Sequence, residues 1–191
     1  MKHGSWVLAL ALVMVMVMAV RPASASQTVG GVTMPERITA FGTELTLNGM
    51  GLRQATFLRL DVYVAGLYVQ EPSQDADYLI ESEQVKVMRL EFVRSVSEDD
   101  MAEALEEGFL SSAEDYATLQ PDVERVIGWL SSFGSGDTLT FSYLPGRGVQ
   151  VAVNGQVRGV TGDAAFGRAL IGIWLGDDPP NERLKRGLLG L

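Results

Sequence analysis

The chain has 191 residues, of which 47% are hydrophobic, and this suits one domain with a substantial core. Its formal net charge of −9 argues against nucleic acid or an anionic membrane surface as a partner. The chain has no cysteine and one histidine, His3, which argues against disulfides, thiolate nucleophiles and zinc sites built from cysteine and histidine. We expect neither a metal site nor a cofactor.

The N-terminal segment has the layout of a secretory signal peptide. A short basic start is followed by an uncharged apolar run, Trp6–Val20, and then by the small-residue triplet Ala23-Ser24-Ala25. A membrane anchor is the alternative, but the run is shorter than the roughly 20 residues that span a bilayer. We therefore predict a signal peptide of residues 1–25 and a mature domain of residues 26–191.

Removal of the signal peptide changes what the mature protein can do. It takes away Lys2 and Arg21 and no acid, so the net charge moves from −9 to −11. It also removes His3, which leaves no imidazole for Ser-His-Asp or Cys-His catalysis. We expect a periplasmic or secreted protein that is not stably inserted in a membrane once the signal is cleaved.

The first part of the mature chain predicts strands. Residues 26–35 are interpreted as a loose lead-in, and weak alternation predicts short strands at 37–41 and 44–48. Asn48-Gly49 is a strong turn dipeptide. The run Phe57–Val69 is rich in β-branched and aromatic residues and has no proline, which predicts a long strand.

The long strand and the glycine-rich segment before it, residues 49–53, are the centre of the functional hypothesis. From Val62 to Val69 the strand is apolar on both faces, as expected for a strand that is covered on both sides. The glycines of the segment let another group approach the backbone closely where Arg53 enters. Because an unpaired buried charge is costly, Arg53 needs a partner. That partner is either a carboxylate of the protein or the anion of a ligand.

A helix is predicted to begin after Ser97. Ser97 and Asp100 form a near capping box, and Met101, Leu105 and Phe109 then follow at the spacing of one helical face. Acidic residues cover the rest of this helix. We interpret them as a solvated face, and the alternative is a metal site or an acid/base pair. The acids in question are Glu103, Glu106 and Glu107.

The remaining elements alternate between strands and helices in separate blocks. Helices are predicted from Pro121-Asp122 to Gly134, from a cap at Thr161 to Gly176 with a buried stripe that includes Trp174, and after Pro179-Pro180. Strands are predicted at 85–94, 137–144 and 149–153, with a tight hairpin at Asn154-Gly155. Hairpin-connected strands with segregated helices predict an α+β protein with an antiparallel sheet.

Three segments carry a resemblance to a known family. They read L-N-G-M-G-L-R at 47–53, V-Y-V-A-G-L-Y-V at 62–69, and F-G-R-A-L-I-G-I-W-L-G-D-D-P-P-N-E-R-L-K-R-G-L-L-G at 166–190. With them, residues 36–191 resemble the chalcone isomerase-like family of secreted bacterial proteins. The resemblance implies the chalcone isomerase fold, a long antiparallel sheet with helices packed on one face (an open-faced β-sandwich) and a cleft between them.

The resemblance also implies site residues. Arg53 matches the catalytic arginine of the family's G-x-G-x-R segment, and Tyr63 stands nearest to the threonine that the isomerases place on the following strand. Fatty-acid-binding relatives hold the ligand carboxylate with an arginine and a tyrosine, which Arg53 and Tyr63 reproduce. The isomerases have further polar residues at positions that correspond here to Val96, Glu103 and Ile173, so most of that polar set is missing.

Three functions remain open on the sequence. The first is a non-catalytic protein that binds a fatty acid or a similar apolar carboxylate in the cleft. The second is an isomerase (an intramolecular lyase) that acts on a chalcone-like substrate, with Arg53 stabilising an oxyanion. The third is an envelope interaction protein without a small ligand, in which Arg53 pairs with a carboxylate of the protein. The candidates for that carboxylate are Glu44, Asp61 and Glu91.

Overall fold

The computed structural model describes residues 25–55 and 60–191, and it has the predicted α+β architecture. Seven antiparallel strands form one sheet in the order β3-β4-β5-β6-β7-β8-β9, so every strand pairs with its neighbours in the chain. This meander needs only hairpin-type connections and loops with helices between its strands. Its strands are β3 (Arg37–Ala40), β4 (Thr43–Ala55), β5 (Leu60–Val69), β6 (Lys86–Phe92), β7 (Thr138–Leu144), β8 (Gly148–Val153) and β9 (Gln156–Thr161).

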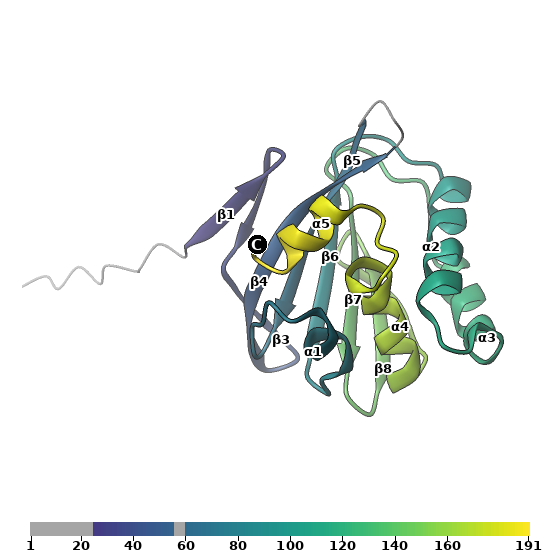
Figure 1. Cartoon of the computed structure of the whole chain (residues 1–191). Helices are drawn as coiled ribbons and strands as arrows, with labels where there is room; N and C mark the ends of the chain where they lie inside the picture. The colour runs from purple at the N-terminus through teal and green to yellow at the C-terminus, as the bar shows by residue number, and fades with distance from the viewer. Residues whose placement is uncertain (1–24, 56–59) are drawn as a thin grey trace, which may run out of the picture.

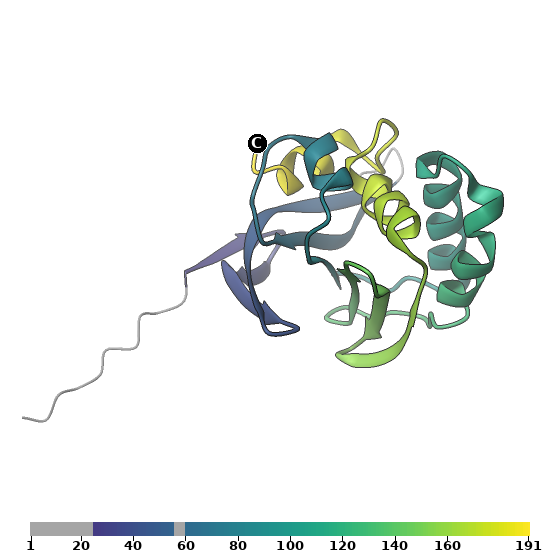
Figure 2. The ribbon, with the colours of Figure 1, turned by 90° about the horizontal axis from the view of Figure 1, so that it is seen from below.

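The helices pack on one face of the sheet, as expected, and the sheet curls partly around them (Figures 1 and 2). The central one is α4, which contacts each of the other four helices. In the part of the chain described here, no helix is long and apolar enough to cross a membrane. The helices are α1 (Ala76–Glu81), α2 (Glu98–Ser112), α3 (Tyr116–Ile127), α4 (Ala164–Leu175) and α5 (Glu182–Leu188).

The opposite face of the sheet is covered in part by an N-terminal hairpin, which corrects the prediction of a loose lead-in. Strands β1 (Ser26–Val29) and β2 (Val32–Pro35) pair through a turn at Gly30-Gly31, where both residues have positive φ. Met34 of this hairpin packs against Gly66 of β5, where an added Cβ would lie 2.4 Å from its sulfur. Because β5 is covered on both sides, its run from Tyr63 to Val69 is buried on both faces, as predicted.

Strand β4 contains a bulge where a turn was predicted. Asn48-Gly49 does not end a hairpin, because the strand continues to Ala55 with a register shift between Leu47 and Gly49. The side chain of Asn48 binds the backbone of Ser73, donating to its carbonyl at 3.0 Å and accepting from its N–H at 2.7 Å. It also donates to the carbonyl of Leu188 at 2.8 Å. A turn-forming residue is used here to hold an extra residue in a strand.

The bulge decides which side chains of β4 face the helices. Side chains alternate along a strand, and one extra residue shifts that alternation. Four apolar side chains of the strand therefore pack on the hairpin-covered face, namely Leu45, Leu47, Met50 and Leu52. Gly49, Gly51 and Arg53 point to the helical face, where α5 lies across the two glycines. An added Cβ on Gly49 would lie 2.1 Å from the carbonyl oxygen of Gly187, so only glycine allows this close contact.

Local signals predict helix α2 correctly but misplace the starts of two others. Ser97 caps α2, as predicted, and accepts from the N–H of Asp100 at 3.1 Å. Helix α3 starts at Tyr116 after the cap Asp115, so Pro121 lies inside the helix and not at its start. It also ends at Ile127, well before Gly134.

The cap of α4 also differs from the prediction. Thr161 ends strand β9, and Asp163 caps the helix by accepting from the N–H of Phe166 at 3.0 Å. Gly162 between them has a φ of +72°, which separates the strand from the helix. The other end of α4 at Gly176 and the tight hairpin at Asn154-Gly155 are confirmed.

Candidate functional site

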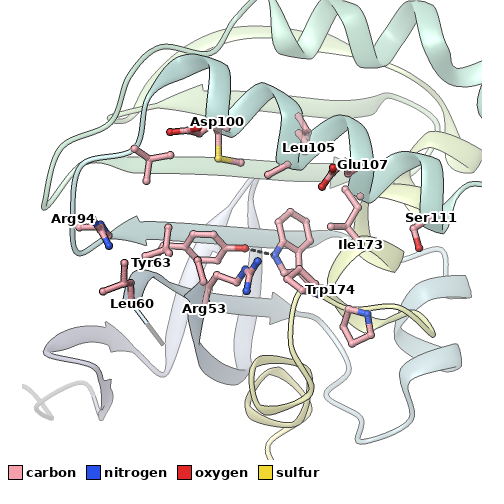
Figure 3. A pocket seen from close by; sticks show the side chains of 18 of the residues that line it. Arg53, Leu60, Tyr63, Arg94, Asp100, Leu105, Glu107, Ser111, Ile173 and Trp174 are labelled. Atoms are coloured by element: carbon pink, nitrogen blue, oxygen red, sulfur yellow. Dashed lines mark hydrogen bonds between the residues drawn. The ribbon is translucent and has the colours of Figure 1, made fainter. Parts of the chain in front are cut away.

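A cavity of about 560 Å³ lies between the helical face of the sheet and helices α2 and α4 (Figure 3). Its walls combine apolar side chains with several charged ones, among them Arg53, Arg94, Asp100, Glu107 and Asp178. Strands β4 and β5 contribute Arg53 and Tyr63, and α4 contributes Trp174. The apolar walls include Val62, Val96, Met101, Ala104, Leu105, Ile173 and Pro179. A cavity with apolar walls and convergent polar groups is typical of a small-molecule site.

Arg53 lies on the helical face of β4 and lines this cavity. In the register of the sheet, it stands directly opposite Tyr63 of β5. Its guanidinium donates to the carbonyl oxygen of Gln54, and within the residues that the structure describes no carboxylate lies within 4.0 Å of it. Both predicted site residues therefore meet at one place, and the charge of Arg53 is left without an ion-pair partner in the described part of the chain.

The carboxylates that were candidates for an internal pair with Arg53 have other partners. Each is held at hydrogen-bond distance by a side chain from the same or a neighbouring strand. Glu44 accepts from Arg37 at 2.8 Å, Asp61 from Gln54 at 2.7 Å, and Glu91 from Arg89 at 3.1 Å. This arrangement disfavours the view that Arg53 is only half of a structural ion pair.

Tyr63 is held in the cavity wall by a residue from the other side of the site. The indole Nε1–H of Trp174 donates to the Tyr63 hydroxyl oxygen at 2.9 Å, and the two side chains are 1% and 7% exposed, respectively. Burial raises the pKa of the Tyr63 phenol, while the Trp174 hydrogen bond and the charge of Arg53 act in the opposite direction. The phenol is therefore protonated at neutral pH and is available as a hydrogen-bond donor.

Sequence reasoning placed Trp174 in the buried stripe of α4 but did not assign it to the site. The signal that was available is chemical, since a buried indole N–H usually finds an acceptor. The identity of that acceptor was not available, because Tyr63 lies 111 residues earlier in the chain. Figure 3 shows the two side chains joined across the cavity wall, with the guanidinium of Arg53 beside them.

The positions that correspond to the missing polar residues of the isomerases are apolar or lie outside the cavity. Val96 and Ile173 line the cavity with hydrocarbon. Glu103 is exposed on α2 and is not part of the lining. The cavity therefore presents Arg53 and Tyr63 as donors but lacks polar groups at the places where the isomerases have them.

The acidic face of α2 is largely solvated, as interpreted from the sequence. Glu103, Glu106 and Glu107 are exposed, and Glu106 accepts from the hydroxyl of Tyr116 at 3.1 Å. Within residues 25–55 and 60–191, no three histidine, aspartate or glutamate side chains are placed to hold a metal ion. Asp100 and Glu107 do reach the cavity, on the side across from Arg53 in Figure 3.

The sequence profile of the chalcone isomerase-like family matches residues 26–190, almost the whole described chain. The chain belongs to the chalcone isomerase-like family. This family assignment agrees with the architecture of a curled antiparallel sheet with helices on one face and a cavity between them.

A solved structure has the same chalcone isomerase-like fold. The crystal structure of a fatty-acid binding protein of Arabidopsis thaliana superimposes with a TM-score of 0.71 over 86% of this chain and 96% of that chain, at 16% sequence identity. At this identity the likeness establishes the fold alone. None of the curated proteins compared has a significantly similar sequence.

Proposed function

We propose that this chalcone isomerase-like protein binds a fatty acid or a similar apolar carboxylate in the cavity and does not catalyse a reaction. The observation that carries the proposal is the pairing of Arg53 with Tyr63 on neighbouring strands, with no carboxylate of the described residues within 4.0 Å of Arg53. The guanidinium suits a carboxylate because it offers a planar pair of N–H donors. Tyr63 adds a further donor from the facing strand.

The apolar walls supply the second part of the binding energy. Each buried methylene contributes about 0.8 kcal/mol. A tail with about ten buried methylenes therefore contributes roughly 8 kcal/mol before the costs of association are subtracted. A hydrogen bond to a charged head adds about 1.5–3 kcal/mol. In this account the tail provides most of the affinity, and the head provides the orientation.

Two further observations support binding over catalysis. The solved structure with the same fold is that of a fatty-acid binding protein. Val96 and Ile173 are apolar where the isomerases have polar residues. One observation also fits an isomerase, because Arg53 lines the cavity and could stabilise an oxyanion there.

The proposal is tested by looking for the ligand. Protein purified from its own host is analysed by native mass spectrometry, followed by extraction and identification of bound lipid. Protein stripped of lipid is then titrated with tetradecanoate by calorimetry, with the methyl ester of the same acid as a control for hydrophobic binding alone. We expect a fatty acid to co-purify with the protein, and we expect tetradecanoate to bind more tightly than its methyl ester. An empty cavity together with no binding of tetradecanoate overturns the proposal.

A further inference from the structure

The hydrogen bond between Trp174 and Tyr63 has a fixed direction. An indole N–H is a donor only, so the Tyr63 oxygen is the acceptor in the 2.9 Å contact. A phenol has one hydrogen of its own to donate, and that hydrogen must point away from the indole. Among the described residues, no other hydrogen bond of the Tyr63 hydroxyl is found. Since Tyr63 lines the cavity, its hydrogen is available to a molecule bound there.

Arg53, like the available hydrogen of Tyr63, acts as a hydrogen-bond donor. A guanidinium donates and never accepts, and the group that it binds in the protein is the carbonyl of Gln54. With the Tyr63 oxygen occupied by Trp174, the two described side chains that would hold the head, Arg53 and Tyr63, present donors and no free acceptor at this corner of the cavity, and the carboxylates of Asp100 and Glu107 lie across the cavity. A carboxylate, which only accepts, satisfies such a corner completely. An alcohol brings a hydrogen of its own, which is left without a partner in a buried place.

We infer that Trp174 is a specificity-determining residue, which selects acceptor-only heads such as carboxylates over alcohols of the same chain length. The inference rests on the proposed function, because it assumes that the head of the ligand lies at Arg53 and Tyr63. Trp174 acts through Tyr63 and is a positioning residue in this account. It occupies the Tyr63 oxygen and thereby directs the Tyr63 hydrogen into the cavity.

A purely structural role for Trp174 predicts a different result. The ring packs in the core beside Phe141, with ring centroids 6.0 Å apart, and its loss would loosen the wall of the cavity. A loosened wall weakens the binding of acids and alcohols alike, because both ligands have the same tail. The ratio of the two affinities therefore separates the specificity role from the structural role.

The experiment measures dissociation constants for tetradecanoate and tetradecanol with four proteins. These are the wild type, Trp174→Phe, Tyr63→Phe and the double variant. We expect the wild type to prefer the acid. We expect Trp174→Phe to lower that preference by about two- to tenfold, the value of one hydrogen bond. In the Tyr63→Phe background, the same Trp174→Phe change should leave the preference constant within about twofold, because the bond is already absent.

The outcomes distinguish this inference from the proposed function. A Trp174→Phe protein that keeps the full preference of the wild type overturns the inference and leaves the proposed function standing. The inference is also overturned if Trp174→Phe lowers the preference for the acid by the same factor in the Tyr63→Phe background as in the wild type. A wild type that binds neither ligand overturns the proposed function and the inference with it.

A second measurement does not require the Trp174→Phe protein to fold. The indole N–H signals of the ¹⁵N-labelled protein are recorded by NMR, with Trp129 as the internal reference. Tyr63→Phe should shift the Trp174 signal upfield through loss of its acceptor and leave Trp129 in place. A Trp174 signal that does not move overturns the inference, because the bond on which it depends is then absent in solution.

Discussion

Arg53 and Tyr63 stand opposite each other on the antiparallel strands β4 and β5, and both side chains face the cavity beneath the helices. Their spacing is set by the sheet and not by a loop. Strand-borne groups keep their geometry in the absence of a ligand, which lowers the entropy that binding must overcome.

Replacing Arg53 by glutamine is expected to weaken tetradecanoate binding at least tenfold and to leave the fold stable. The expectation on binding follows from the loss of charged hydrogen bonds, worth about 1.5–3 kcal/mol. The expectation on stability follows from the absence of a carboxylate partner among the described residues, so no buried acid is left unpaired. Calorimetric titration and thermal unfolding measure the two effects.

A matched control is Arg37→Gln, which breaks the exposed pair between Arg37 and Glu44. Exposed ion pairs contribute little, so neither binding nor stability should change appreciably. Loss of one partner of a buried ion pair costs about 3–5 kcal/mol. A loss of stability of that size in Arg53→Gln would contradict the interpretation that Arg53 has no carboxylate partner among the described residues.

Chalcone cyclisation is expected to stay near the uncatalysed rate. Val96 and Ile173 place hydrocarbon where the isomerases have polar groups, and Glu103 lies outside the cavity. The absorbance of a chalcone is followed with purified protein and with Arg53→Gln as the control. Turnover of about 1 per second or faster, within the usual range of enzymes, that depends on Arg53 would establish the isomerase function in its place.

Gly49→Ala is expected to destabilise the protein by about 1–3 kcal/mol or more, the usual cost of overpacking. The new Cβ would lie 2.1 Å from the carbonyl oxygen of Gly187 and 2.8 Å from that of Leu188, so α5 would have to move off β4. Gly128→Ala is the control, because its Cβ would meet nothing closer than 3.5 Å. Urea unfolding compares the two, and equal stabilities would show that α5 is not held by this contact.

Lys86 is a lysine of β6 that is 1% exposed, and its burial makes the free energy of unfolding depend on pH. Its Nζ donates to the carbonyl of Ile80 at 2.7 Å and lies 5.6 Å from the ring centroid of Tyr143. Burial lowers the pKa of Lys86 to about 8, although the neighbouring Glu83 and Glu81 act to raise it. Between pH 8 and the ordinary lysine pKa, the unfolded chain therefore binds more protons than the folded one.

Stability is consequently expected to rise as the pH increases from 8 to about 9.5, by at most about 1.4 kcal/mol per pH unit. Lys86→Met should abolish the rise. Tyr68, whose pKa burial raises to about 12, acts in the opposite direction only above the ordinary tyrosine pKa, so the chosen range isolates the lysine. Urea unfolding at several pH values measures the slope, and a flat or falling profile in the wild type would refute the assignment.

The sequence predicts elements well where the signals are local. Helix α2 is an example, since its cap at Ser97 and its buried face at Met101, Leu105 and Phe109 lie within one segment. The hairpin β1–β2 was missed because its strands are short, and they are held by packing of Val32 and Met34 against residues of β4 and β5, far along the chain. Tertiary packing decides such segments, and composition does not reveal it.

The site could be predicted only in part. Arg53 was singled out by the glycine-rich segment before the long strand and Tyr63 by the family resemblance, and the register of β4 with β5 brings them together. The sequence did not predict that Arg53 lacks a carboxylate partner among the described residues, because this depends on which side chains of neighbouring strands bind the nearby carboxylates. The role of Trp174 required the docking of α4 on the sheet, which no local pattern encodes.

The proposed export of the protein gives a separate prediction. We expect the mature chain to begin at Ser26, because a short apolar run precedes the triplet Ala23-Ser24-Ala25. Intact-mass measurement of protein from the periplasm or the culture medium of the host tests this. A mass that still includes residues 1–25, recovered with the membrane fraction, would support an anchor.

The bulge at Asn48 offsets the alternation of β4, so that Leu47 and Arg53, six positions apart, lie on opposite faces of the sheet. In a strand of the same length without the bulge, the two residues would share a face, and the arginine would point to the side covered by the hairpin. A relative that lacks the bulge therefore keeps its arginine in the pocket only if this segment is one residue shorter. In sequence comparisons, a one-residue gap in this stretch is thus compatible with the same pocket, whereas an ungapped segment without the bulge is not.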